Sequence, residues 1–121
     1  MSGPTQSPID GQVFMLASAK ASVDPNTLSD LLVRVQAHVG DRLDAYRRDF
    51  ERVAEKADRE VFLVPTGHWI EVGERLDMTD RERKAVARAH AEQLRRIGSD
   101  SGRDEEFETA LEIREAVVVG R

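Results

Sequence analysis

A short run of β-prone apolar residues, EVFLV at positions 60–64, constrains the fold of this chain more than any other segment. Pro65 ends the run, because proline cannot donate a ladder hydrogen bond. A single strand leaves its backbone groups unpaired, and buried backbone groups need partners. The run can find a partner strand in residues 48–54, in residues 117–119 or in the same run of a second copy of the chain. We expect a hairpin of residues 48–54 with 60–64, a small two-stranded β element.

Most of the remaining chain has the spacing of amphipathic helices. One helix follows the turn at residues 24–27 and carries a single apolar stripe, made of Leu28, Leu31, Leu32, Val35 and Val39. Gly40 stands where a left-handed C-cap is expected. The other predicted helices cover residues 10–23, 66 or 67 to 78, 80–97 and 104–120, with a loop at 98–102. Thr79 and Glu82 form a capping box at the start of the predicted helix 80–97. Residues 41–57 fit a helix and a strand equally.

These elements predict an α+β fold: a single compact, mostly helical domain over residues 9–121, after a disordered tail at residues 1–8. The chain has 121 residues, too few for two independent cores. It has no cysteine, which excludes disulfides, thiolate metal sites and cysteine nucleophiles. It also has no apolar run long enough to span a membrane, and its start lacks the features of a secretory signal. We therefore expect a cytoplasmic protein that does not associate with membranes.

Basic and acidic residues are segregated locally, although the whole chain has a net charge of −5. Residues 81–96 carry six basic side chains against two acidic ones, and residues 99–115 carry seven acidic against two basic. Four cations share one face of the predicted helix 80–97: Arg81, Lys84, Arg88 and Arg95. Such a stripe can follow the phosphates of a nucleic acid. Alternatively, acidic residues of the following helix neutralise it within the chain, the candidates being Glu105, Glu108, Glu112 and Glu115.

The loop at residues 65–69 is a candidate ligand site because it leaves the apolar strand and enters a helix. Its candidate binding residues are Thr66, Gly67, His68 and Trp69. The alternative is structural: Pro65 stops the strand, Thr66 caps the helix and Trp69 lies in the core.

The first predicted helix is apolar nearly all round, which is typical of a central helix or of one at an interface. In the second case one face packs on the core, with Val13, Leu16, Ala17 and Lys20. The other face contacts a partner through Phe14, Met15 and Ala21.

Sequence motifs for catalysis are absent, so no catalytic residue, metal ligand or cofactor is predicted. The three histidines do not show the spacing that places two imidazoles on one helix face. His90, within an apolar stripe, is expected to be a hydrogen-bonded core residue.

Arginine outnumbers lysine 15 to 3, a bias produced by GC-rich coding or by adaptation to salt. Three segments resemble a family of small uncharacterised proteins of halophilic archaea: REVFLVPTGHWIEVGERL, RAHAEQLRRIG and FETALEIREAVVVG. The resemblance spans residues 9–120 and implies a cytoplasm of high salt, but no activity, cofactor or site. High salt would screen long-range attraction by the basic stripe.

Three functions follow from these features, in order of preference. The first is a non-enzymatic protein–protein interaction or assembly module, homodimeric, whose partner is itself or another protein. The second is a nucleic-acid-associated regulator that uses the basic face of helix 80–97. The third is a protein that binds a small anion or other ligand at the 65–69 loop.

Overall fold

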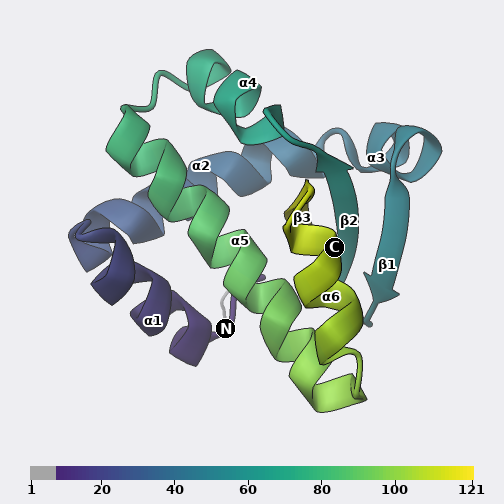
Figure 1. Ribbon diagram of the computed structural model, residues 1–121. Coiled ribbons are helices and arrows are strands. Elements are labelled where there is room, and N and C mark those ends of the chain that lie inside the picture. The colour runs from purple at the N-terminus through teal and green to yellow at the C-terminus, as the bar shows by residue number, and fades with distance from the viewer. Residues whose placement is uncertain (1–7) are drawn as a thin grey trace.

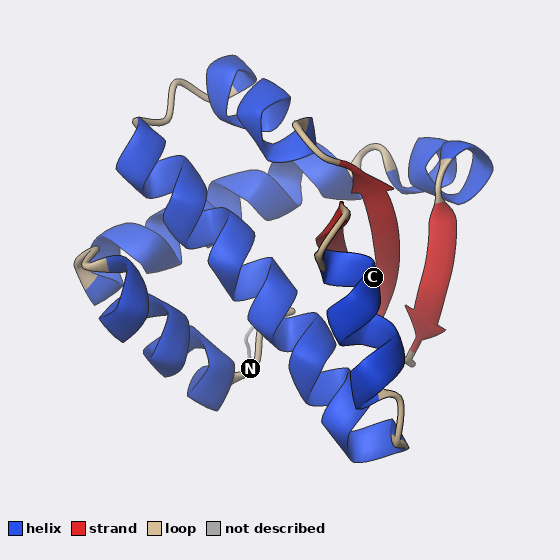
Figure 2. Cartoon of the chain, viewed as in Figure 1, coloured by secondary structure: helices blue, strands red, loops and turns tan. Residues whose placement is uncertain are grey.

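The computed structural model describes residues 8–121, which form six helices and a three-stranded sheet (Figures 1 and 2). In chain order the elements are α1 (Gly11–Ala21), α2 (Pro25–Gly40), α3 (Leu43–Asp49), β1 (Glu51–Glu55), β2 (Arg59–Pro65), α4 (His68–Arg75), α5 (Asp80–Ser101), α6 (Asp104–Leu111) and β3 (Arg114–Gly120). Of the predicted tail, residues 1–7 lie outside the described residues. Pro8 is buried, and its carbonyl accepts a hydrogen bond of 2.7 Å from Arg59.

The sheet has three antiparallel strands in the order β1-β2-β3, so the predicted two-stranded element is too small. The expected hairpin forms, with β1 beginning at Glu51 and a register shift between Arg52 and Ala54. β2 also pairs along its other edge with β3, where Phe62 lies opposite Val117. Both candidate partners within the chain are therefore used, and β2 needs no second copy.

The predicted helix 104–120 is wrong beyond Leu111, where α6 ends. Residues 117–119 are three consecutive valines, whose branched side chains favour strands, and β2 provides a backbone edge for them. The ambiguous segment 41–57 resolves into both structures, helix α3 followed by strand β1.

Two glycines were assigned wrong roles. Gly40 is the last residue of α2, and the following Asp41 has right-handed backbone angles, so no left-handed cap forms there. Gly98 lies inside α5 and not in a loop; the helix continues to Ser101 and ends at Gly102, which has φ of 73°. A Cβ atom at Gly98 would lie 2.8 Å from the ring of Phe107, so this glycine allows α6 to pack closely on α5. The Thr79–Glu82 capping box is confirmed.

Helix α5 is the centre of the structure, and it contacts α1, α2, α4, α6 and β3. In Figure 1 it runs diagonally across the molecule, with α1 on one side and α6 with β3 on the other. Helix α1 is not central, since it packs on α5 and, less extensively, on α2.

The outer edge of β3 has no neighbouring strand, and side chains from three helices satisfy its backbone. Trp69 Nε1 of α4 donates to the Ala116 carbonyl at 3.0 Å. The Val118 amide donates to His90 Nδ1 of α5 at 2.8 Å. Gln36 of α2 makes two such bonds, donating to the Val118 carbonyl at 2.7 Å and accepting from the Gly120 amide at 2.9 Å. The sheet edge thereby connects α2, α4 and α5.

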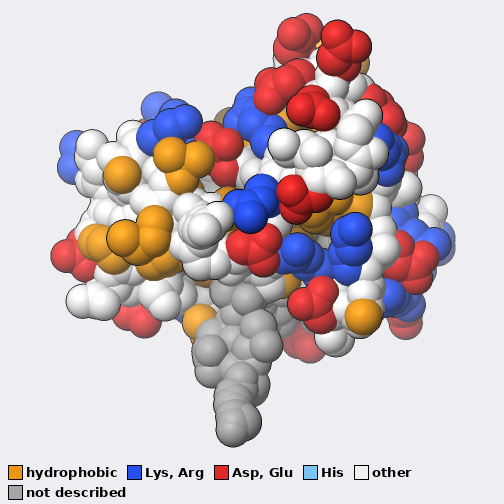
Figure 3. All heavy atoms as spheres, turned by 90° about the horizontal axis from the view of Figure 1, so that it is seen from below, with side chains coloured by type: hydrophobic (Ala, Val, Ile, Leu, Met, Phe, Trp, Pro, Cys, Tyr) orange, Lys and Arg blue, Asp and Glu red, His pale blue; other side chains and the backbone are white. Residues whose placement is uncertain are grey.

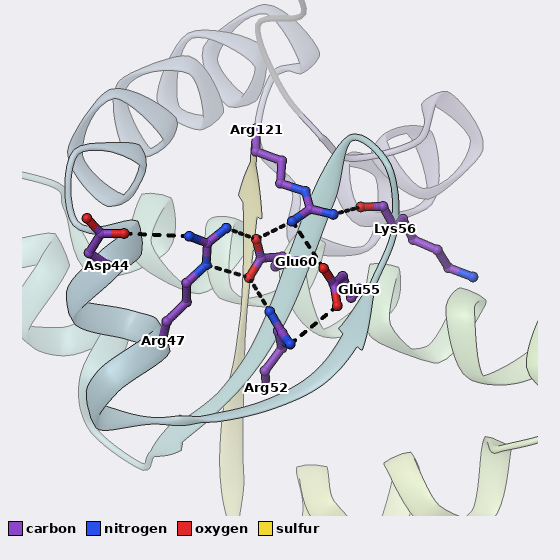
Figure 4. A network of polar contacts seen from close by, with 7 residues as sticks. All are labelled: Asp44, Arg47, Arg52, Glu55, Lys56, Glu60 and Arg121. Atoms are coloured by element: carbon purple, nitrogen blue, oxygen red, sulfur yellow. Dashed lines mark hydrogen bonds and ion pairs between the residues drawn. The ribbon is translucent and has the colours of Figure 1, made fainter.

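On the central strand β2, the side chain of Glu60 is fully buried beneath three guanidinium groups (Figure 4). Its oxygens accept hydrogen bonds from Arg47 Nε at 3.0 Å, Arg52 Nη1 at 3.1 Å and Arg121 Nη1 at 2.7 Å. Glu55 bridges Arg52 and Arg121 at 3.3 Å each. Hydrogen bonding from Arg47, the largest cause, lowers the pKa of Glu60 to about 2. This cluster connects α3, β1, β2 and the C-terminal residue.

We predict that Glu60→Gln lowers the free energy of unfolding at pH 7 by about 2–3 kcal/mol, because it removes a carboxylate with charge-assisted bonds. Since the pKa of Glu60 is lowered in the folded protein, its contribution is complete above about pH 4.5 and is lost as pH falls toward 2. Urea unfolding of the wild type and the variant across this pH range measures the difference in free energy of unfolding. Glu105→Gln, at an exposed site, is the control; equal losses in both variants would contradict the prediction.

We predict that His90→Asn reduces the pH dependence of stability below pH 6.5. Burial lowers the pKa of His90 to about 3, so its contribution is complete above pH 6.5 and is lost as pH falls toward 3. The slope for one proton is about 1.4 kcal/mol per pH unit. His38 and His68, whose pKa values are also lowered, contribute in the same direction, so the slope decreases without vanishing. Urea unfolding at pH 7, 6 and 5 would show an unchanged slope if the prediction is wrong.

Candidate functional site

The site with the clearest binding chemistry is a hollow between α4, α5 and β3, with a volume of about 430 Å³. We call it the basic groove. Its lining consists of Trp69, Arg83, Lys84, Ala87, Arg88, Ala91, Arg95, Leu111, Arg114, Glu115 and Ala116. Five of these side chains are cationic and one is anionic, while most of the others are apolar. The groove therefore combines an apolar lining with several positive charges.

The β3 edge holds the indole of Trp69 in this lining. Trp69 Nε1 donates to the Ala116 carbonyl, and the Trp69 amide donates to Glu115 Oε1, each at 3.0 Å. The indole also packs against the imidazole of His90, with 4.6 Å between ring centroids and 52° between the ring planes. Because Glu115 accepts the Trp69 amide, the single carboxylate of the lining is engaged with the backbone.

A second hollow of about 450 Å³ adjoins the first on the side of α1, and we call it the α1-side hollow. It is lined by Lys20, Ala21, Asp80, Arg81, Lys84 and Arg88. Lys84 and Arg88 line both hollows, so these two cations of α5 lie between them.

The four residues of the predicted basic stripe differ in their pairing. Arg95 forms an ion pair of 2.7 Å with Glu108 of α6, one of the acidic neighbours proposed to neutralise the stripe, and a weaker one with Glu92. Arg81, Lys84 and Arg88 form no ion pair with any residue between 8 and 121. Three of the four cations therefore keep their charge available to a ligand.

Sequence reasoning missed Arg83 and Arg114 as residues of the groove. Arg114 pairs with Glu51 at 2.7 Å and begins β3, which the sequence placed inside a helix. Arg83 lies next to the stripe in sequence and pairs with Asp80 at 3.5 Å. Only the correct assignment of β3 would have brought Arg114 to the groove.

The four candidate residues of the 65–69 loop do not form one site. Thr66 Oγ1 donates to the Ile113 carbonyl at 3.0 Å and does not cap α4, whose N-cap is Gly67 with φ of 100°. Trp69 is buried and lines the basic groove, whereas His68 lines a separate cavity beside Tyr46. The loop therefore contributes to two different hollows.

The predicted partner face of α1 is only partly exposed. Met15 has 63% of its surface exposed, but Phe14 and Ala21 are half-buried and pack against the core. Leu16, expected to face the core, is 43% exposed. Figure 3 shows hydrophobic side chains gathered on the side where α1 lies, while acidic and basic side chains interleave on the opposite side.

Histidine chemistry within residues 8–121 does not point to a metal. No group of three or more histidine, aspartate or glutamate side chains is placed there to hold one. As expected, His90 is a buried core residue whose Nδ1 accepts a backbone hydrogen bond.

The fold and the groove define a small α+β domain with a cation-lined hollow beside its sheet edge. Residues 7–121 match the family model described as a domain of unknown function (DUF8048), and the chain belongs to this family. Searches of curated proteins and of solved structures found no match. Among the described residues, no helix has the length and apolar character needed to cross a bilayer.

Proposed function

We propose that this protein binds a small molecule carrying phosphate or carboxylate groups in the basic groove, without catalysing a reaction on it. The observation that carries the proposal is the placement of Lys84 and Arg88, which lack ion pairs within residues 8–121, beside the partly exposed apolar side chains of Ala87, Ala91 and Leu111. Concave apolar surfaces with a few convergent polar groups are typical of ligand sites. The cations would bind the anionic group, and the lining would accept the apolar part.

The charge balance of the chain supports a specific site over general attraction to anions. A net charge of −5 opposes the approach of an anion, so binding depends on short-range contacts. Hydrogen bonds from lysine or arginine to phosphate are among the strong ones in proteins. Arg81 and the α1-side hollow extend the positive surface for a longer ligand.

A nucleic acid is a less favoured ligand of the same residues. Arg95 is already paired with Glu108, which shortens the stripe to three available cations. Trp69, the only tryptophan, is buried, and sequence-independent binding of single strands usually needs exposed aromatic rings. The high-salt cytoplasm that the family resemblance implies would weaken a nucleic acid more than a small ligand, because the loss grows with the number of phosphates contacted.

We predict that Lys84→Gln/Arg88→Gln weakens binding by about 10- to 100-fold, because two charge-assisted contacts are lost. Calorimetric titration with AMP, ATP, inorganic phosphate and a short single-stranded oligonucleotide, at low and at molar salt, measures the affinity. Tryptophan fluorescence reports directly on the groove, since Trp69 lines it.

The matched control is Arg48→Gln/Lys56→Gln, which removes the same charge from exposed positions on α3 and on the β1–β2 turn. It should retain full affinity. Absence of binding by every probe, or equal weakening in both variants, would overturn the proposal. Preferential binding of the oligonucleotide with a steep salt dependence would favour the nucleic-acid function instead.

Self-association through α1 is a second candidate function, favoured by the exposure of Met15 and Leu16. Adjacent apolar side chains on a surface helix are typical of contact surfaces. The strand 60–64 could have paired with the same strand of a second copy, but β2 is paired on both edges within one chain. Self-association therefore has only the exposed residues of α1 in its favour, and it ranks second.

If α1 mediates a dimer, Met15→Glu/Leu16→Glu should convert it to a monomer, because two charges would become buried at the contact. Sedimentation velocity at tens of micromolar protein measures the oligomeric state. Ile113→Glu, at another exposed apolar position, is the control and should leave the dimer intact. A wild-type chain that is strictly monomeric would reject this function.

A further inference from the structure

A separate cavity of about 190 Å³ lies where α2, α3 and α4 come together at one end of the molecule (Figure 1). We call it the α4 cavity. It is lined by His38, Arg42, Ala45, Tyr46, Phe50, His68, Glu71, Val72 and Arg75. Its volume is below the roughly 300 Å³ at which sites for drug-sized ligands begin, so it suits a group of few atoms.

Two guanidinium groups in this lining are not neutralised. Arg42 donates to the His38 carbonyl at 2.7 Å, and neither Arg42 nor Arg75 forms an ion pair with a residue between 8 and 121. The imidazole of His38 likewise has no hydrogen-bond partner among those residues. Three potential donors to an anion therefore line one small space.

The charges in the cavity are separated between its two histidines. Burial is the largest cause that lowers the pKa of His38; Arg42, Arg75 and His68 lower it further, and Asp41 opposes them. Glu71 and Glu115 act on His68 and partly offset the lowering of its pKa by burial. The two cations of the cavity therefore act on His38, whereas Glu71, the one carboxylate in the lining, acts on His68.

The remaining walls are aromatic and already engaged. Tyr46 Oη and His68 Nε2 are hydrogen-bonded at 2.6 Å, and burial raises the pKa of Tyr46 to about 12. Phe50 contacts the His68 ring edge-on, with 5.6 Å between centroids. These contacts engage Tyr46 and His68 with each other, so both shape the cavity and leave anion binding to Arg42, Arg75 and His38.

We propose that the α4 cavity binds one small oxyanion, a phosphate, sulfate or carboxylate group, between the guanidinium groups of Arg42 and Arg75 and the imidazole of His38. The oxyanion would compensate the two arginines and accept a hydrogen bond from His38. Since a nearby negative charge favours the protonated imidazole, binding and proton uptake by His38 reinforce each other. Affinity for the anion should therefore rise as pH falls through the titration of His38.

The test is an NMR titration of the histidine side chains of the full chain, which has only three histidines. Inorganic phosphate, sulfate, acetate and, as the control salt, chloride are compared at constant ionic strength. We expect phosphate to raise the midpoint of the His38 titration by about one pH unit, because a new charge lies within contact distance. His90, buried away from the cavity, should not respond.

The variant Arg75→Gln should weaken the phosphate response at least tenfold. The side chain of Arg75 is exposed and makes no hydrogen bond to another described residue, so this variant is expected to fold. Arg48→Gln removes an exposed arginine of α3 outside the cavity and is the matched control. Lys84→Gln/Arg88→Gln, which tests the basic groove, should leave the His38 response unchanged.

The comparison among anions distinguishes the source of the oxyanion. A response to phosphate and sulfate but not acetate assigns a tetrahedral anion, and a response to acetate assigns a carboxylate. A His38 midpoint that is the same in every anion as in chloride would overturn the proposal. So would equal weakening by Arg48→Gln and Arg75→Gln, since that would indicate only the general field of the protein.

Discussion

The outer edge of β3 is buried and has no strand beside it, so its backbone groups bond to side chains of α2, α4 and α5. A sheet edge without a strand beside it must find other hydrogen-bond partners or lose several kcal/mol of stability. Trp69, His90 and Gln36 provide these partners, and each belongs to a different helix. The positions of α2, α4 and α5 around the sheet are therefore set by specific polar contacts as well as by burial of apolar surface.

The same contacts build the basic groove. Trp69 reaches the groove because its indole nitrogen is bonded to the edge of β3. His90 directs one face of α5 toward β3, so Lys84 and Arg88, which share another face of this helix, lie at the surface. A core histidine and a core tryptophan thus determine where the exposed cations stand. The Glu60 cluster connects α3 and β1 to β2 in a comparable way, with charged groups in place of neutral donors.

Local signals in the sequence predicted what depends on local structure. The capping box at Thr79, the apolar stripe of α2 and the hairpin of β1 with β2 are confirmed. The sequence offers residues 117–119 as one possible strand partner of 60–64, but favours a helix there, because a run of three valines reads equally as the end of a helix and its partner lies more than fifty residues away. The sequence predicts a loop at Gly98 because the close packing against Phe107 that requires this glycine exists only in the folded structure.

The candidate site shows the same difference between local and tertiary features. The sequence predicts which cations share a face of α5, but it does not predict which of them form ion pairs. Across residues 8–121, which contain all 18 lysine and arginine side chains, eleven form ion pairs and seven do not. Five of those seven line the basic groove, the α1-side hollow or the α4 cavity: Arg42, Arg75, Arg81, Lys84 and Arg88. In an acidic protein, carboxylates are plentiful enough to pair with most cations. At the unpaired cations beside concave surfaces, an anion can therefore bind without breaking an ion pair within the protein. These cations are the residues that should contribute most to the free energy of anion binding.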